Sequence, residues 1–83
     1  MNIDKTNLFE LKKSDVEEVR EKINAVYDAL KERGYNPINQ LVGYLISGDL
    51  GYISSHKDAR KIIQGLDRAK IVEILLEEFQ NRK

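Results

Sequence analysis

The segment Ser54-Ser55-His56-Lys57-Asp58 brings together the residue types that hydrolases use for nucleophilic catalysis. His56 is the only histidine of the chain, and imidazole is the side chain that exchanges protons near neutral pH. A catalytic triad, however, needs three groups that converge in space with defined hydrogen bonds, which adjacent residues do not ensure. A turn that leads into a helix explains the same residues. We therefore expect that this protein is not an enzyme.

Two other kinds of chemistry lack their motifs. The glycines of Gly48-Asp49-Leu50-Gly51 are not followed by the Gly-Lys-Ser/Thr ending of a phosphate-binding loop. The chain has no cysteine and one histidine, so it lacks the ligands of a Cys/His metal site and cannot form a disulfide framework. We expect no cofactor and no bound metal.

Basic side chains are concentrated in one region, although the formal net charge is zero with 14 basic and 14 acidic residues. Between Ser55 and Lys70 there are five basic and two acidic residues. Such a surface can bind an acidic protein or a phosphate group, and the alternative is an ordinary solvated helix face. The predicted partner-binding residues are Lys57, Arg60, Lys61 and Arg68.

The elements that must position these side chains begin with two helices. Apolar residues at three- and four-residue spacing predict a first helix that starts at the N-cap Ser14 and stops at Gly34. A second helix is predicted between the N-cap Asn36 and Gly48. Gly43 lies inside it and costs about 1 kcal/mol relative to alanine. We attribute this glycine to the close approach of another helix.

Two further helices are predicted in the second half of the chain. Ser54 or Ser55 is expected to cap the third, whose apolar face consists of Ala59, Ile62, Ile63 and Leu66. Asp67 is expected to cap the fourth. The apolar face of this last helix is predicted to consist of Ile71, Val72, Leu75, Leu76 and Phe79. No alternation typical of strands appears.

These patterns predict an all-α protein, a compact bundle of about four short helices. Residues 14–83 are expected to form the helical domain, and residues 1–13, which lack an apolar stripe, a flexible regulatory arm. A chain of 83 residues buries only a modest core, which favours association with a second copy. We predict a homodimer whose interface includes Ile38, Leu41, Val42 and Leu45.

The apolar runs are too short to span a membrane, and the N-terminus lacks the pattern of a signal peptide, so we expect a cytoplasmic protein without a membrane partner. Zero net charge argues against nucleic acid as the main partner. The alternative function is nevertheless a small nucleic-acid-binding protein in which the third and fourth helices act like a helix-turn-helix.

The segment from Val26 to Arg60, "VYDALKERGYNPINQLVGYLISGD…YISSHKDAR", resembles the IreB/ReoM family of Firmicute bacteria, and the resemblance covers nearly the whole chain. It implies a helical, non-enzymatic, cytoplasmic homodimer that is phosphorylated by a membrane Ser/Thr kinase and regulates peptidoglycan synthesis. In the better understood branch, the unphosphorylated protein promotes Clp-dependent degradation of the enolpyruvyl transferase that commits precursor to the wall. Phosphorylation of an N-terminal threonine stops this activity.

The resemblance also implies particular site residues. The family's phosphorylated threonine lies in the pattern Asp-x-Thr with an aromatic residue three positions later, which Asp4, Thr6 and Phe9 match. Thr6 is therefore the candidate phosphorylation site. Arg60 and Arg68 match basic positions of the family. The chain differs from the family's usual residues at Ser54, Ser55, Gln64 and Gly65, and also at Asn7, Leu50 and Gly51.

Overall fold

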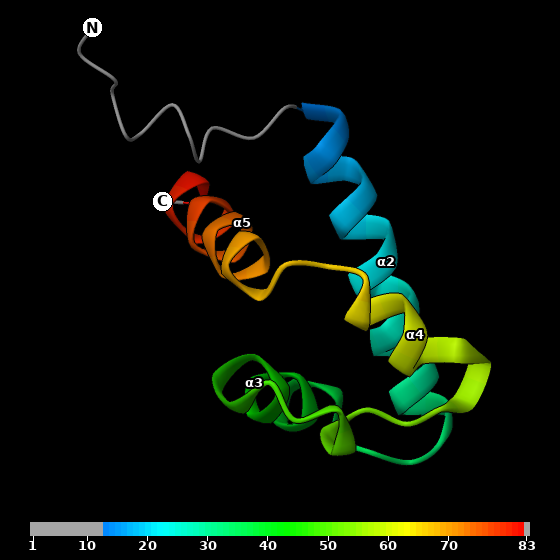
Figure 1. Cartoon of the computed structure of the whole chain (residues 1–83). Coiled ribbons are helices and arrows are strands. Elements are labelled where there is room, and N and C mark those ends of the chain that lie inside the picture. Colours follow the sequence, from blue (N-terminus) through cyan, green and yellow to red (C-terminus); the bar gives the residue numbers. More distant parts are fainter. Residues whose placement is uncertain (1–12, 83) are drawn as a thin grey trace, which may run out of the picture.

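The computed structural model describes residues 13–82 and shows an all-α protein (Figure 1). The α-helices are α2 (Lys13–Glu32), α3 (Pro37–Ser47), α4 (Ala59–Gln64) and α5 (Arg68–Asn81). Two short 3-10 helices, η1 (Leu50–Tyr52) and η2 (His56–Asp58), lie between α3 and α4. The predicted fold class is confirmed, and no strand occurs between residues 13 and 82.

Helix α2 is the longest element, and the other helices are arranged along it (Figure 1). Helix α4 packs across α2, and α3 lies at the C-terminal end of α2. Helix α5 lies beside the first half of α2, where residues of both helices line a common groove. The predicted N-cap, Ser14, lies inside the helix, because α2 already begins at Lys13, two residues before the predicted first helical residue, Asp15. Residues 1–12 of the predicted arm lie outside the described part.

The core collects apolar side chains from every part of the described chain. Its largest fully buried members are Val26 and Leu30 of α2, Ile53 after η1, Ile63 of α4 and Ile71 of α5. The sequence pattern placed Ile53 in a connector rather than in the core. Its burial follows from the short 3-10 turn of η1, because the turn directs the extended residue after it back under α4.

The ends of α2 and α3 follow the predicted local signals. Gly34 has a φ of +85° and ends α2, and Gly48 has a φ of +75° and ends α3. Both backbones lie in the left-handed region that glycine adopts without strain. At the start of α3, Oδ1 of Asn36 accepts a hydrogen bond from the N–H of Asn39 at 3.1 Å. These three predicted helix boundaries are confirmed.

The capping of the last two helices is confirmed only in part. At the start of α5, Oδ1 of Asp67 accepts a hydrogen bond from the N–H of Ala69 at 2.8 Å, as predicted. The prediction for α4 was wrong, because η2 separates both Ser54 and Ser55 from the start of that helix. Oγ of Ser54 instead accepts a hydrogen bond from the backbone N–H of His56 at 3.0 Å.

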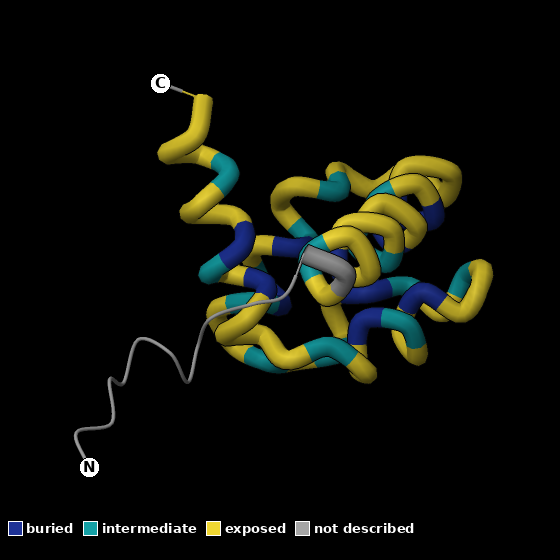
Figure 2. The backbone as a smooth tube through the Cα atoms, turned by 90° about the horizontal axis from the view of Figure 1, so that it is seen from above, coloured by how far each residue is buried: buried dark blue, intermediate teal, exposed yellow. Residues whose placement is uncertain are grey.

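Helix α5 turns a smaller part of its apolar surface toward the core than predicted. Ile71 and Ile74 are buried, whereas the sequence pattern did not include Ile74. The other residues of the predicted apolar face are 39–68% exposed: Val72, Leu75, Leu76 and Phe79. Figure 2 shows the C-terminal half of α5 projecting from the body with mostly exposed residues. Of the five residues of the predicted apolar face, only Ile71 is therefore buried in the protomer.

Gly43 accommodates an aromatic ring. A Cβ atom added at Gly43 would lie 2.5 Å from Cε1 of Tyr52. Tyr52 belongs to η1, and its carbonyl accepts a hydrogen bond from Nε2 of Gln40 at 2.9 Å, which ties η1 to α3. The close approach expected at Gly43 is thus present, and within residues 13–82 it comes from a side chain of the short 3-10 helix η1 rather than from a helix backbone.

We predict that the effect of Gly43→Ala on stability reverses sign when the ring of Tyr52 is removed. In the parent chain, the new methyl group should displace the ring and lower the free energy of unfolding. In a Tyr52→Ala background, the same substitution should raise the free energy of unfolding by about 1 kcal/mol through helix propensity. Urea denaturation of the four chains measures this coupling, and equal effects in both backgrounds would contradict the ring contact.

Candidate interaction site

The four predicted partner-binding side chains are all exposed but lie on three elements. Lys57 belongs to η2, Arg60 and Lys61 to α4, and Arg68 is the first residue of α5. Three of them bond to other parts of the chain, each to a different segment. Lys61 alone among the four has no hydrogen bond or ion pair to residues 15–82. Lys57, Arg60 and Arg68 thus make structural contacts that the charge pattern did not indicate.

Arg68 connects the beginning of α5 to the end of α3. Its Nη1 donates a hydrogen bond to the carbonyl of Leu45 at 3.2 Å. The guanidinium covers Gly48 so closely that a Cβ there would lie 2.7 Å from Cζ of Arg68. The last carbonyl groups of a helix lack intrahelical partners and carry partial negative charge. Arg68 therefore caps α3 from the neighbouring helix.

Arg60 holds the segment between η1 and η2 against α4. Its Nε donates a hydrogen bond to the carbonyl of Ile53 at 2.9 Å. Ile53 has no exposed surface, and a buried carbonyl without a partner would cost about 1–3 kcal/mol. Arg60 therefore satisfies a buried acceptor, which is a structural role that the charge pattern did not indicate.

Glu32, the last residue of α2, joins that helix to η2. His56 Nε2 lies 2.9 Å from Glu32 Oε1, and Lys57 Nζ lies 3.0 Å from Glu32 Oε2. A carboxylate only accepts hydrogen bonds, so the imidazole Nε2 carries the proton in this contact. The hydrogen bonds from His56 and then Lys57 lower the pKa of Glu32 below its ordinary value of 4.5. They also offset the unfavourable negative charge at a helix C-terminus.

The backbone is strained at the two residues that directly precede α4. Lys57 and Asp58 have φ values of +52° and +59°, a region that costs non-glycine residues about 1–2 kcal/mol each. Such strain persists when neighbouring contacts hold it in place. Glu32 holds His56 and Lys57 at the start of this turn, and the fully buried Ala59 follows the turn. Lys57 and Asp58 are therefore presented to solvent in a fixed geometry.

The residues that suggested a hydrolase do not form a triad in the structure. The ring of His56 contacts Glu32 of α2. Oγ of Ser54 contacts the backbone of His56 and not its ring. Within residues 13–82, no three His, Asp or Glu side chains are grouped so that they could hold a metal ion. Across the same residues, no helix combines the length and hydrophobicity needed to cross a membrane.

The predicted dimer-interface residues are distributed over two sides of α3. Ile38 and Val42 are 57% and 48% exposed, and Ile46 on the same side is 80% exposed. We call these three residues the outer face of α3. Leu41 is buried in the core, and Leu45 is half-buried against it. The latter two residues thus contribute mainly to the protomer itself.

A second exposed apolar surface lies on α5 and is close to the first. We call its members, Val72, Leu76 and Phe79, the outer face of α5; they are 39%, 59% and 68% exposed. Leu45 of α3 and Val72 of α5 line one hollow, together with Arg68. The hollow shows that the start of α5 lies close to the end of α3. Exposed apolar patches of this kind are typical of protein interfaces.

The family model described as "IreB regulatory phosphoprotein" matches residues 4–81. The chain belongs to the IreB family. A UPF0297 protein of Clostridioides difficile (strain 630) is 49% identical over 82 residues, which cover 99% of this chain and 96% of that protein. A UPF0297 protein of Acetivibrio thermocellus is 49% identical over 76 residues, or 92% and 84% of the two chains. The resemblance inferred from the sequence is confirmed, and it assigns the protein a regulatory role.

Sequence reasoning missed Glu32 as the residue that organises the His56 region. The two residues are 24 positions apart, and no local pattern relates them. It also did not separate the apolar residues of α5 that the protomer buries from those that it exposes. A signal for these exposed residues was available in the sequence. Apolar residues occupy more than one side of this helix, whereas a helix that packs on one core needs only a single apolar stripe.

We predict that Arg60→Ala lowers the free energy of unfolding by about 1–3 kcal/mol, because it leaves the buried carbonyl of Ile53 without a partner. Lys61→Ala is the matched control on the same helix and should change it by less than about 0.5 kcal/mol. Urea denaturation measures both variants. Equal effects would show that the Arg60 hydrogen bond contributes nothing to stability.

The lowered pKa of Glu32 predicts a pH-dependent contribution to stability. Because the folded state favours the ionised carboxyl, this contribution is present above pH 4.5, the ordinary pKa, and is lost as the pH falls through the lower folded-state value. Wild type should have a higher urea midpoint than Glu32→Gln at pH 6, and the difference should vanish in strong acid. A difference that stays constant from pH 6 to acid would contradict the Glu32 contacts.

Proposed function

We propose that this protein is a non-enzymatic regulator of peptidoglycan synthesis whose binding to other proteins is controlled by phosphorylation of Thr6. The observation that carries the proposal is the match to a family of regulatory phosphoproteins over residues 4–81, a range that includes Thr6. The proposed partners are a Ser/Thr protein kinase, the Clp protease and a peptidoglycan-precursor enzyme whose turnover the protein modulates. The proposed location is the cytoplasm.

The exposed basic side chains supply a surface suited to such regulation. Arg60 uses only Nε in its bond to Ile53, and its two terminal amino groups have no partner among residues 15–82. A guanidinium has five N–H donors, so Arg60 can support the fold and still bind a carboxylate or phosphate. The bond to Ile53 also reduces the side-chain entropy that binding would remove. Lys61 lies beside it on the exposed surface of α4.

The contacts of His56 support a non-enzymatic role. Its imidazole bonds to Glu32 at the end of α2, where the pair connects two elements. A nucleophile within reach of that ring would favour catalysis, but the hydroxyl of Ser54 bonds to the backbone of His56 instead. The cluster therefore serves the fold of the turn that presents Lys57.

The outer faces of α3 and α5 support the proposal of a homodimer. Together they expose six large apolar side chains of a chain with only 83 residues: Ile38, Val42, Ile46, Val72, Leu76 and Phe79. Covering such surface is favourable by about 25 cal/mol per Å² of apolar area. A second copy offers the same surface in return, as the isologous interface of a two-fold dimer requires.

We predict that Val42→Glu together with Ile46→Glu produces a folded monomer. Both side chains are exposed in the protomer, so the charges should oppose association without disturbing the core. Sedimentation equilibrium at micromolar concentration should show a dimer for wild type and a monomer for the variant, with helical circular dichroism retained. Asn39→Glu, at an exposed polar position of α3, is the control. A wild-type monomer at this concentration contradicts the dimer.

We predict that the family's kinase phosphorylates Thr6. Phosphorylation adds nearly two negative charges and three acceptor oxygens, so it should change which proteins the chain captures. Phosphopeptide mapping after incubation with the kinase identifies the site, and pull-downs with Thr6→Ala and Thr6→Glu identify the partners. Phosphate on Ser54 or Ser55 with unmodified Thr6 would contradict the assignment.

A pull-down with a Lys61 variant tests the basic surface, and a gel shift tests the alternative function. Lys61→Glu should reduce partner capture by at least tenfold while the unfolding midpoint stays near that of wild type, because Lys61 has no structural bond within residues 15–82. A gel shift that weakens steeply with salt would instead support the alternative, a small nucleic-acid-binding protein.

A further inference from the structure

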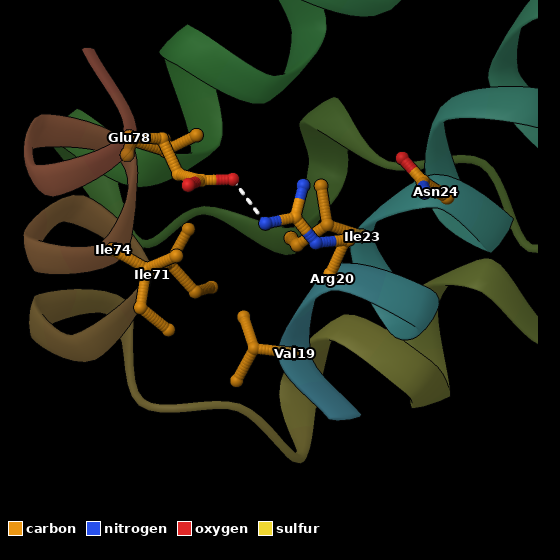
Figure 3. A pocket seen from close by; sticks show the side chains of 8 residues that line it. Val19, Arg20, Ile23, Asn24, Ile71, Ile74 and Glu78 are labelled. Atoms are coloured by element: carbon orange, nitrogen blue, oxygen red, sulfur yellow. Dashed lines mark hydrogen bonds and ion pairs between the residues drawn. The ribbon is translucent and has the colours of Figure 1, made fainter. Parts of the chain in front are cut away.

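An apolar groove lies between the first half of α2 and α5 (Figure 3). Val19 and Ile23 line it from α2, and three residues line it from α5: Ile71, Ile74 and Leu75. Figure 3 shows Arg20 and Glu78 pointing toward one another at its edge, where they form an ion pair. The groove is on a different side of α5 from its outer face, because none of the outer-face residues lines it.

The groove has room for one apolar side chain. Its volume is about 120 Å³. For comparison, an apolar cavity of about 150 Å³ in another protein binds benzene. Protein interiors rarely keep voids larger than a water molecule, because the atoms that line a void lose dispersion contacts. Val19, Ile71 and Ile74 are at most 9% exposed, so the floor of the groove is already a core surface that lacks one neighbour.

The chain itself carries apolar side chains in the segment that precedes α2. Residues 1–12 precede α2 directly and contain four large apolar residues: Ile3, Leu8, Phe9 and Leu11. From Lys13 to Val19 the helix rises by about 9 Å. The four residues from Phe9 to Lys13 span up to about 13 Å when extended. Phe9 can therefore fold back to the level of Val19.

We propose that the groove is a docking site for this chain's own N-terminal segment, with the ring of Phe9 inserted between α2 and α5. The phenyl ring matches the volume of the groove. Leu11 is two residues from Lys13, too close to the start of α2 to reverse direction and reach Val19. Ile3 is joined through a longer tether, which raises the entropy cost of closing the loop.

The charges beside the groove fit this occupant. Glu10 follows Phe9 directly and brings a carboxylate to the edge of the groove, where Arg20 lies. The present partner of Arg20 is Glu78, and both side chains of this pair are partly exposed, at 51% and 36%. An exposed pair of this kind contributes little stability. Glu10 can therefore share or replace the contact with Arg20 at small cost.

Methyl NMR of the full-length chain tests the docking on the natural phenylalanine. A ring in the groove should shift the methyl resonances of Ile74 and Ile71 through its ring current, and Phe9→Ala should remove that shift. Asn7→Ala, two residues earlier, is the matched control and should leave these resonances in place. Unchanged Ile74 and Ile71 resonances in Phe9→Ala would overturn the proposal.

Fluorescence then decides whether the docked ring belongs to the same copy. The chain has no tryptophan, so Phe9→Trp reports on this position alone. Its emission should be blue-shifted, several-fold less sensitive to acrylamide than that of Asn7→Trp, and independent of protein concentration. If the blue shift disappears on dilution to a monomer, Phe9 docks on a second copy and the proposal fails.

Two neighbouring substitutions on α5 locate the docking site. Leu75 lines the groove and is 49% exposed, whereas Leu76 does not line it and is 59% exposed. Leu75→Glu should shift the emission of Phe9→Trp to that of solvated tryptophan, while Leu76→Glu should leave it blue-shifted. Circular dichroism confirms that both variants fold. Loss of the blue shift with Leu76→Glu alone would place Phe9 outside the groove and overturn the proposal.

Discussion

The main constraint on this molecule is that its short helices present more apolar surface than one protomer can cover. Helix α2 alone is long enough to pack against both α3 and α4, and its Val26 and Leu30 form the centre of the core. Helices α3 and α5 each bury one side and expose another. A fully buried large apolar side chain contributes about 1.5–3 kcal/mol, so exposed residues such as Ile46 and Phe79 represent stabilisation that the protomer does not obtain.

A small core makes the polar contacts between elements correspondingly important. Arg68 joins α5 to α3, Arg60 joins α4 to the segment at Ile53, and Glu32 joins α2 to η2. Each contact satisfies a group that needs a partner, namely a helix-end carbonyl, a buried carbonyl and a carboxylate at a helix C-terminus. These side chains also lie on the exposed surface. The residues suited to bind a partner are therefore partly the residues that hold short elements together.

Features that depend on residues close together in the sequence could be predicted. Contacts between residues far apart in the sequence could not. Gly34, Asn36 and Gly48 act within one turn, so the ends of α2 and α3 were correctly placed. Apolar periodicity shows that a side of α5 avoids water, but it does not show whether the protomer's own core covers that side. The contact of Tyr52 with Gly43 and that of Glu32 with His56 arise from the tertiary arrangement. For the same reason, charge counts grouped basic residues that the structure separates over three elements.

The position of α5 connects the two proposed associations. Ile71 and Ile74 on one side of α5 line the groove shared with α2, and Val72 of its outer face lines a hollow together with Leu45 of α3. An occupant of the groove would hold α5 against α2, and a second copy on the outer face would hold the same helix from another side. Because the groove and the outer face lie on different sides of α5, each association can form without the other. Because Thr6 is three residues from Phe9, a phosphate there would act on the docking of the arm without any change in the core.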